Sequence, residues 1–110
     1  RSSLSEEPLL EILEYVDLVE GFNARTASSA ANNKGTAFAA EHGLPTTAVS
    51  DAHTTRELGR SYTELPEFDG TPEGFKVALR DARLEKHPAG MLVHLYTTFA
   101  KLRHTLTPRR

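Results

Sequence analysis

Val16 to His53 reads VDLVEGFNARTASSAANNKGTAFAAEHGLPTTAVSDAH, and the pattern of apolar and polar residues within it predicts an α/β fold. Residues 16–22 carry apolar side chains on both faces, which is typical of a strand in a parallel sheet that is covered on both sides. An alanine-rich helix is expected over residues 27–42, with Gly43 as its stop signal. Residues 45–50 are rich in β-branched side chains and predict a second strand. A strand, a helix and a strand in this order predict a parallel βαβ unit.

The flanking sequence continues this alternation in both directions. A short helix is expected from Ser5 to about Tyr15, because a hydroxyl and two acids precede its apolar residues. After the second strand, residues 51–68 show little periodicity and predict a long loop. Thr71 followed by proline begins another helix, and an extended piece is expected at residues 83–85.

The last part of the chain predicts an amphipathic helix followed by a basic tail. Five apolar residues recur there at helical spacing: Leu92, Leu95, Phe99, Leu102 and Leu106. Such a stripe needs a surface to cover, so self-association through this helix is expected where no other surface covers it.

Composition and charge exclude several classes of protein. Thirteen basic and 15 acidic residues give a net charge of −2, which does not favour binding to nucleic acid or to an anionic membrane. The absence of cysteine excludes disulfides, thiolate zinc sites and thiol nucleophiles, and is compatible with the cytoplasm. No apolar run approaches the roughly 20 residues that a membrane span needs, so no membrane partner is expected. Two or three strands are too few for a stable parallel sheet, and the chain begins at Arg1, so we expect a fragment of a larger fold.

Asp51 and His53 are the main candidates for chemistry. They directly follow the second expected strand, and residues i and i+2 of an extended chain point to the same side. Ligands of α/β proteins bind beyond the carboxyl ends of the strands. A carboxylate oxygen and an imidazole nitrogen are good ligands for the divalent ions of zinc, manganese and iron. The alternative is that Asp51 caps a helix and His53 is an ordinary loop residue, since two ligands do not complete a site.

Four further residues are expected near this site: Glu20, Asn23, Arg25 and Arg56. The first three lie at or after the end of the first strand, where Arg25 would bind a phosphate with both arms of its guanidinium. Arg56 lies in the loop after Asp51 and His53, where it would meet a substrate phosphate. The alternatives are ordinary solvated arginines and burial of Glu20 against a helix end. Because no base-and-nucleophile pattern surrounds Ser50, no catalytic residue is assigned beyond the two metal ligands.

The order of these segments resembles the C-terminal part of the PHP family, the polymerase and histidinol phosphatase domain. The resemblance rests on the segments 16–25, 33–38, 39–45, 48–54 and 57–59, and its most specific piece is Ser-Asp-Ala-His at residues 50–53. It covers less than half of the chain, and the helices expected beyond residue 70 are not part of it.

The resemblance implies a distorted (β/α)7 TIM-like barrel with a cluster of divalent metal ions at the carboxyl ends of its strands. Residues 1–86 would be the C-terminal βα units of that barrel, and residues 87–110 the amphipathic helix with its basic tail. In the family the aspartate and histidine of the last motif bind metal, which implies this role for Asp51 and His53. The family's earlier His-x-His, Glu and single-His motifs are absent from this sequence, so the isolated chain is expected to be inactive.

The function that the resemblance implies is metal-dependent hydrolysis of a phosphoester bond. The substrate would be a phosphorylated small molecule or a nucleotide, and the first partner would be the N-terminal part of the same barrel. Two alternatives stay open. One is a PHP-like module that serves in structure or binding without catalysis, and the other is a small helical interaction domain in which Asp51 and His53 are incidental.

Overall fold

The computed structural model describes residues 5–90 of the chain. Its elements follow in the order α1 (Glu6–Glu11), η1 (Leu13–Tyr15), β1 (Val19–Asn23), α2 (Ser29–Glu41), β2 (Thr46–Val49), η2 (Thr55–Glu57), β3 (Tyr62–Glu64), α3 (Pro72–Arg80) and β4 (Arg83–Glu85). The apolar stripe of the expected last helix, its basic tail and the self-association through them lie outside the described residues, and the division at residue 86 stays a prediction. Among the helices of residues 5–90, none has the length and apolar character to cross a membrane.

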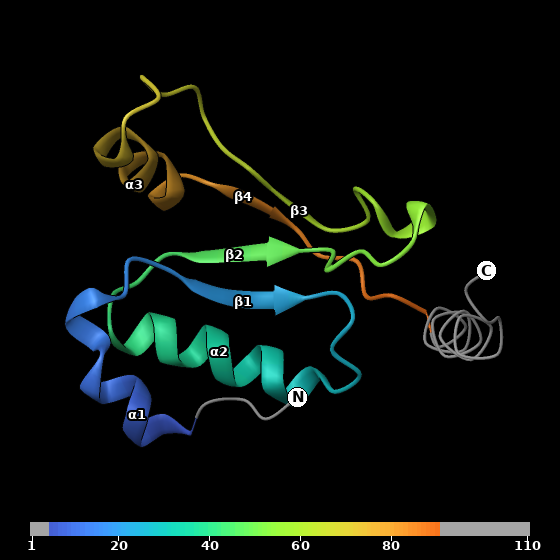
Figure 1. The fold of residues 1–110 in the computed structure, drawn as a ribbon, viewed down its shortest axis with the longest axis horizontal. Coiled ribbons are helices and arrows are strands. Elements are labelled where there is room, and N and C mark those ends of the chain that lie inside the picture. Colours follow the sequence, from blue (N-terminus) through green and yellow to red (C-terminus); the bar gives the residue numbers. More distant parts are fainter. Residues whose placement is uncertain (1–4, 91–110) are drawn as a thin grey trace, which may run out of the picture.

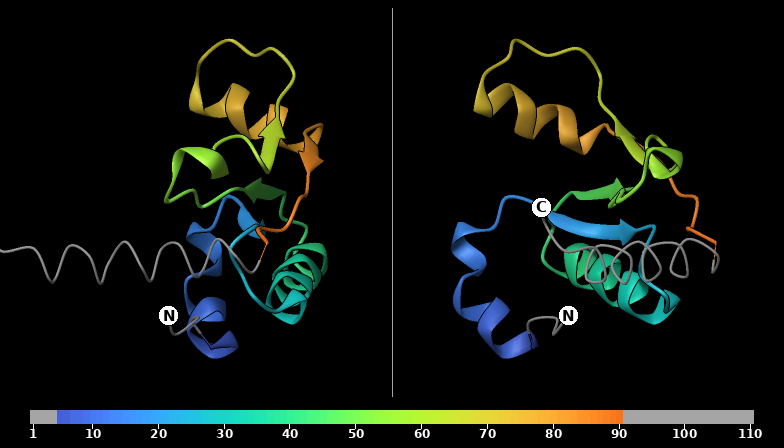
Figure 2. Two further views of the ribbon diagram at one scale, coloured as in Figure 1. Left: turned by 90° about the vertical axis from the view of Figure 1, so that its right-hand side faces the viewer. Right: turned by 45° about the vertical axis from the view of Figure 1, so that its right-hand side comes forward.

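β1, α2 and β2 form the parallel βαβ unit that the sequence predicts. β1 pairs with β2 in parallel, and α2 covers one face of the pair (Figures 1 and 2). The Ser28 hydroxyl caps α2 by accepting a hydrogen bond of 3.2 Å from the Ala30 amide. At the other end Gly43 has a φ of +66°, the left-handed conformation with which helices commonly end. The first strand begins at Val19, three residues later than expected, because η1 and a short connection occupy the residues before it.

Gly21 interrupts the pairing of β1 with β2. The register shifts between Glu20 and Phe22, so one extra residue lies in β1 at this point. A Cβ atom at position 21 would lie 2.9 Å from the Cβ atom of Thr46, which is closer than side chains approach. The Gly21 carbonyl accepts a hydrogen bond of 3.2 Å from the Thr36 hydroxyl of α2. Glycine therefore lets the backbone bulge where β1, β2 and α2 meet.

β3 and β4 form an antiparallel pair beside β2, with Thr63 opposite Leu84. A side chain joins β3 to β2: the Thr63 hydroxyl accepts a hydrogen bond of 2.9 Å from the Ala48 amide and donates one of 3.0 Å to the Ala48 carbonyl. The expected loop over residues 51–68 is therefore wrong in part, since η2 and β3 interrupt it. A strand of three residues is too short to show an alternating pattern in the sequence.

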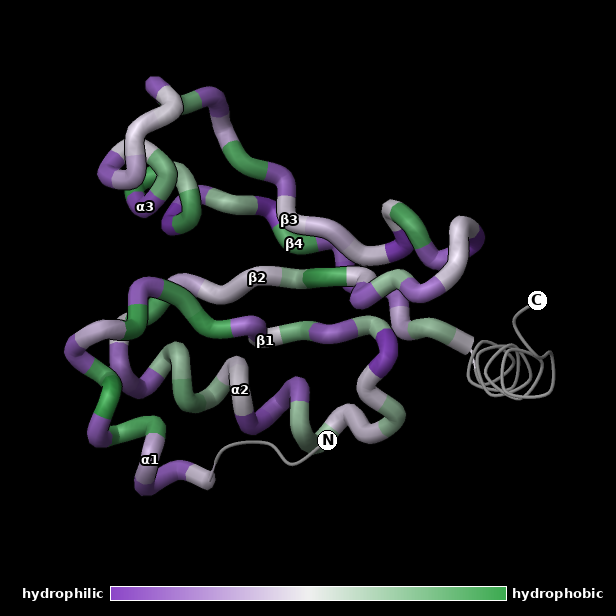
Figure 3. The backbone as a smooth tube through the Cα atoms, in the orientation of Figure 1, coloured by the Kyte–Doolittle hydropathy of each residue, from purple (hydrophilic) through white to green (hydrophobic). Residues whose placement is uncertain are grey.

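The buried core of residues 5–90 is small and consists mostly of alanine: Ala24, Ala39, Ala48, Ala78 and Leu79. Val19 and Phe22 of β1 are only half-buried, so the expectation of a strand covered on both faces is not met within these residues. Apolar residues of α1, η1 and the start of β1 run along one side (Figure 3), where Tyr15 is 78% exposed. The architecture is mixed α/β with two short sheets, and a closed barrel is not seen in this part of the chain.

Candidate functional site

The candidate residues meet at the edge where β1 and β2 both end (Figure 1). Asn23 is the last residue of β1, and Asp51 and His53 follow β2, so the parallel pairing brings two loops together. The segment after β4 closes the same edge. The Ala89 amide donates a hydrogen bond of 2.7 Å to the Ala24 carbonyl.

Asn23 links two of the predicted acids. Its Nδ2 donates hydrogen bonds to Glu20 Oε1 at 2.8 Å and to Asp51 Oδ2 at 3.2 Å. In a regular strand, residues three apart point to opposite faces, so Glu20 and Asn23 would not meet. The extra residue at Gly21 turns Asn23 to the side of Glu20. One amide group therefore lies between two carboxylates and moderates their repulsion.

Asp51 and His53 contact each other, although not for the reason predicted. The expectation of an extended chain is wrong, because Asp51 has a φ of +49°, a left-handed conformation that aspartate tolerates better than most residues. The turn that follows brings His53 Nδ1 to 2.7 Å from the backbone oxygen of Asp51. A carbonyl oxygen only accepts hydrogen bonds, so Nδ1 carries a proton and Nε2 is the ring atom that can bind a metal ion.

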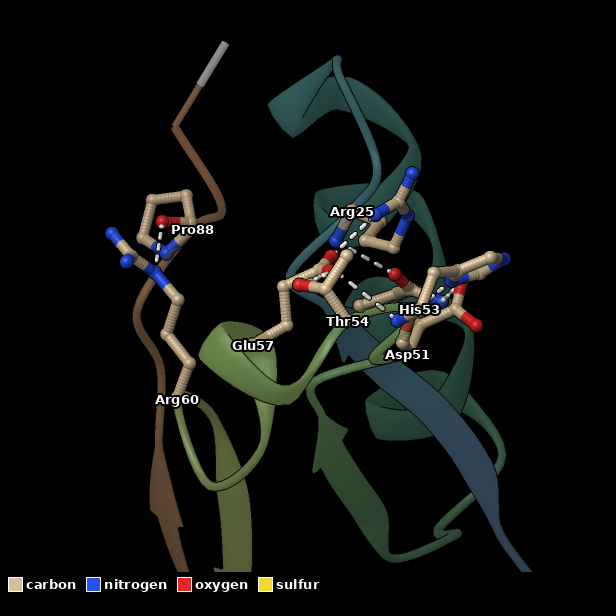
Figure 4. Close-up of polar contacts among 8 residues, drawn as sticks. Arg25, Asp51, His53, Thr54, Glu57, Arg60 and Pro88 are labelled. Carbon is tan, nitrogen blue, oxygen red and sulfur yellow. Dashed lines mark hydrogen bonds and ion pairs between the residues drawn. The ribbon is translucent and has the colours of Figure 1, made fainter. Parts of the chain in front are cut away.

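Glu57, at the end of η2, was not predicted as part of the site. Its side chain is almost fully buried, at 2% exposed. Its Oε2 accepts hydrogen bonds from the His53 amide at 3.1 Å and from the Thr54 hydroxyl at 2.8 Å, and its Oε1 forms an ion pair with Arg25 Nη1 (Figure 4). Burial by itself would raise the pKa of Glu57. The hydrogen bonds from Thr54, Arg25 and His53, and the charge of Arg25, outweigh burial and lower this pKa to about 2.

A signal for Glu57 was present in the sequence. Thr54 and Glu57 have the spacing of a capping box, in which a hydroxyl begins a helix and an acid follows three residues later. Thr54 is indeed the residue before η2, and the acid reaches back toward it. The spacing does not reveal Arg25, which lies 32 positions before Glu57 and comes close only through the fold.

The arginines have different surroundings. Arg25 lies in the ion pair with Glu57, and its backbone amide donates to Asn23 Oδ1 at 2.9 Å. Arg56 is exposed on η2 and takes part in none of the hydrogen bonds just described. Arg60 Nε donates a hydrogen bond of 2.9 Å to the Pro88 carbonyl. The fold thus brings together five of the predicted residues at one edge: Glu20, Asn23, Arg25, Asp51 and His53. Arg56 is exposed on η2 and makes none of their contacts.

The chemistry of the donor atoms suits a divalent metal ion, but the number of protein ligands is too small for a complete site. Asp51 offers a carboxylate, and exposed His53 offers Nε2 with its tautomer set by a backbone carbonyl, as is common for metal-binding histidines. Within residues 5–90, no group of three or more histidine, cysteine or acidic side chains is arranged to hold a metal. A catalytic zinc usually has three protein ligands, so the described residues would supply part of a site.

A protein-family model described as PHP-associated matches residues 29–84, just over half of the chain. The match contains α2, β2, η2, β3, α3 and part of β4, and with them Asp51, His53 and Glu57. Neither a curated protein nor a solved structure matches the chain.

Proposed function

This chain belongs to the PHP-associated family, and on that premise we propose that it supplies two ligands, Asp51 and His53, to the metal centre of a phosphoester hydrolase. The observation that carries the proposal is the contact between His53 Nδ1 and the Asp51 backbone oxygen. It assigns Nδ1 to the backbone and leaves Nε2 to bind an ion, and it fixes the ring after a strand end, where α/β proteins bind their ligands.

In this proposal the residues of this chain bind the metal ion and orient the groups around it. Asp51 binds through a carboxylate oxygen, and a carboxylate accepts several partners at once, of which the Asn23 amide is one. His53 binds through Nε2. Divalent zinc, manganese or iron suits this pair, and such ions, when bound, acidify water and neutralise charge on phosphate oxygens. The remaining ligands come from outside residues 5–90.

We propose a phosphorylated small molecule or a nucleotide as the substrate class. The charge of Arg25 is matched by buried Glu57, so Arg25 is better suited to holding the loops than to clamping a phosphate. Exposed Arg56, next to Glu57 on η2, is the better candidate for meeting the substrate. The cytoplasmic location stays a prediction from the cysteine-free sequence.

The partner that we propose is the remainder of a PHP-type barrel. A groove of about 800 Å³ lies between α1, β1 and α2, and Leu9, Val19 and Phe38 are among its lining residues. Leu10, Ile12 and Tyr15 nearby are exposed. Apolar surface of this kind is typical of an interface, and additional strands and helices of the same barrel would cover it.

A non-catalytic PHP-like module is the second candidate. The observation in its favour is that residues 5–90 hold no metal-binding group of three. In that case the site would bind metal weakly or not at all, and the chain would serve as a structural part of a larger protein.

The test uses the full-length protein with Asp51→Asn and His53→Ala. Asparagine tolerates the positive φ at position 51, so the first change removes charge without straining the turn. Asp17→Asn and His87→Ala are the controls, because both side chains are exposed and contact other residues, Lys76 and Glu85. Bound manganese, zinc and iron are measured by elemental analysis, together with the hydrolysis of a generic phosphoester.

We expect each site variant to lose bound metal and to hydrolyse at least about 100-fold more slowly, while the controls behave as wild type. Unchanged metal content in both site variants would rule out the ligand roles. Little or no bound metal in the wild-type protein, together with no hydrolysis, would favour the non-catalytic module.

A further inference from the structure

The largest side chain that is almost completely buried in residues 5–90 belongs to an acid, Glu57. An ionised carboxylate in such a place is costly unless it is paired and hydrogen-bonded. An apolar side chain of similar size would fill the same space without that cost. The reason for an acid here must therefore lie in the donors that its two oxygens bind.

The two oxygens accept hydrogen bonds from two different loops. Oε1 receives Arg25, which follows β1, while Oε2 receives the Thr54 hydroxyl and the backbone amide of His53, which follow β2. Only a group with two acceptor atoms can join these donors, since arginine, amide and hydroxyl all donate. Glu57 thus ties the loop that carries His53 to the end of the neighbouring strand (Figure 4).

We propose that Glu57 is a positioning residue for the metal centre and acts through His53. The inference rests on the proposed function of Asp51 and His53. Glu57 holds the His53 backbone through its amide, and the Asp51 carbonyl holds the His53 ring through Nδ1. Each of these contacts restrains one end of the residue. Together they orient Nε2 before any ion arrives, which lowers the entropy lost on binding.

The contact with Arg25 completes this arrangement. Arg25 has a side chain that is 10% exposed, and its own amide is held by Asn23 Oδ1, the residue that also contacts Asp51. Glu57 is therefore connected to His53 directly and to the Asp51 side chain by way of Arg25 and Asn23. A change at Glu57 should consequently disturb both proposed ligands.

The test measures manganese affinity of the full-length protein by competition with a chelator. Glu57→Gln is the main variant, because one of its side-chain atoms becomes an NH₂ group that must face a donor, either Arg25 or the His53 and Thr54 pair. Glu64→Gln is the matched control, since Glu64 undergoes the same chemical change in an exposed ion pair with Arg83. We expect Glu57→Gln to weaken manganese binding by about 10- to 100-fold, and Glu64→Gln to leave it unchanged.

A second pair of variants keeps the proposal testable where Glu57→Gln fails to fold. Thr54→Val removes one donor to Oε2 at nearly constant shape, while Thr54→Ser retains the hydroxyl. We expect weaker manganese binding in the valine variant and nearly wild-type binding in the serine variant. The visible absorption spectrum of the cobalt-substituted protein is a further readout, because a misplaced imidazole changes the geometry around the ion.

The outcomes separate this inference from the proposed function. Weak binding in Asp51→Asn and His53→Ala, with normal binding and a normal cobalt spectrum in folded Glu57→Gln, would overturn the positioning role alone. Reduced thermal stability in Glu57→Gln or Thr54→Val with unchanged affinity would likewise show a purely structural role. Normal binding in Asp51→Asn and His53→Ala would overturn both proposals.

Discussion

Glu57 carries its charge in the interior because both oxygens of its carboxylate accept hydrogen bonds. The desolvation of an ion costs several kcal/mol, and a single hydrogen bond does not offset it. Three donors and the charge of Arg25 do so here, which is why the pKa of Glu57 is lowered to about 2 although burial acts in the opposite direction. The ionised form is therefore part of the folded state.

Acid should weaken the fold through this residue. The pKa of Glu57 is about 2 in the folded chain against an ordinary value of 4.5, so the ionised form stabilises the fold fully above pH 4.5. The contribution, roughly 3 kcal/mol, is lost as the pH falls from 4.5 toward 2. The check is urea unfolding of the metal-free full-length protein. At pH 6 the free energy of unfolding of wild type should be well above that of Glu57→Gln, and at pH 3 the difference between the two proteins should be much smaller. A gap that does not change with pH would contradict the assignment.

At the scale of elements, one side chain, that of Thr63, hydrogen-bonds β3 to β2. The Thr63 hydroxyl both accepts from and donates to Ala48, so it takes the place of a backbone partner for a buried residue. This junction places β3, and through it η2, beside the end of β2. Thr63 therefore anchors the strand that follows the segment carrying His53 and Glu57.

Thr63→Val should destabilise the protein more than Thr63→Ser. Valine keeps the shape of threonine but leaves the Ala48 amide and carbonyl without this partner, at a cost of about 1–3 kcal/mol. Serine retains the hydroxyl and should cost less. Thermal or urea unfolding of both variants measures the difference, and equal losses would show that the hydroxyl does not hold the two strand pairs together.

At the scale of the whole molecule, the described residues form an open assembly. Two short sheets stand side by side, and α2 packs against β1 on one face of the β1–β2 pair (Figure 1). The groove between α1, β1 and α2 has a mostly apolar lining. The buried core consists largely of alanines and would contribute little burial energy by itself. Further elements packed in the groove would add the missing burial.

Two leucines of α1 test whether the groove is filled in the full-length protein. Leu9 lines the groove, whereas Leu10 is 49% exposed and is not among the lining residues. We expect Leu9→Lys to lower the free energy of unfolding by about 2 kcal/mol or more, because a charge would replace a covered apolar group. Leu10→Lys should change it by about 0.5 kcal/mol or less. Small effects at both positions, measured by urea unfolding, would indicate a groove open to water.

The fold was predictable where the signal is local and long enough. The βαβ unit follows from apolar runs, an alanine-rich helix and Gly43, and the Thr71 cap of α3 is confirmed by a hydrogen bond of 3.0 Å from the Gly74 amide. β3 was missed because three residues show no period. Asp51 and His53 could be named as a pair from their spacing after a strand. The left-handed turn at Asp51, which brings the two residues into contact, could not be predicted from the sequence, because its conformation depends on the contacts around it.

The amino-acid sequence alone determined the parallel βαβ unit, the end of α2 at Gly43, the start of α3 at Thr71 and the placement of Asp51 and His53 after a strand. The patterns that predict these features lie between residues a few positions apart, so neighbouring side chains encode them. The sequence did not determine the end of α1, which lies at Glu11 and not near Tyr15. Only the tertiary structure decided which groups surround the pair. Asn23 reaches Asp51 across 28 positions and Arg25 reaches Glu57 across 32, and these contacts exist because the pairing of β1 with β2 brings the two strand ends together. The bulge at Gly21 then sets the side to which Asn23 points, which no pattern of alternating residues reveals.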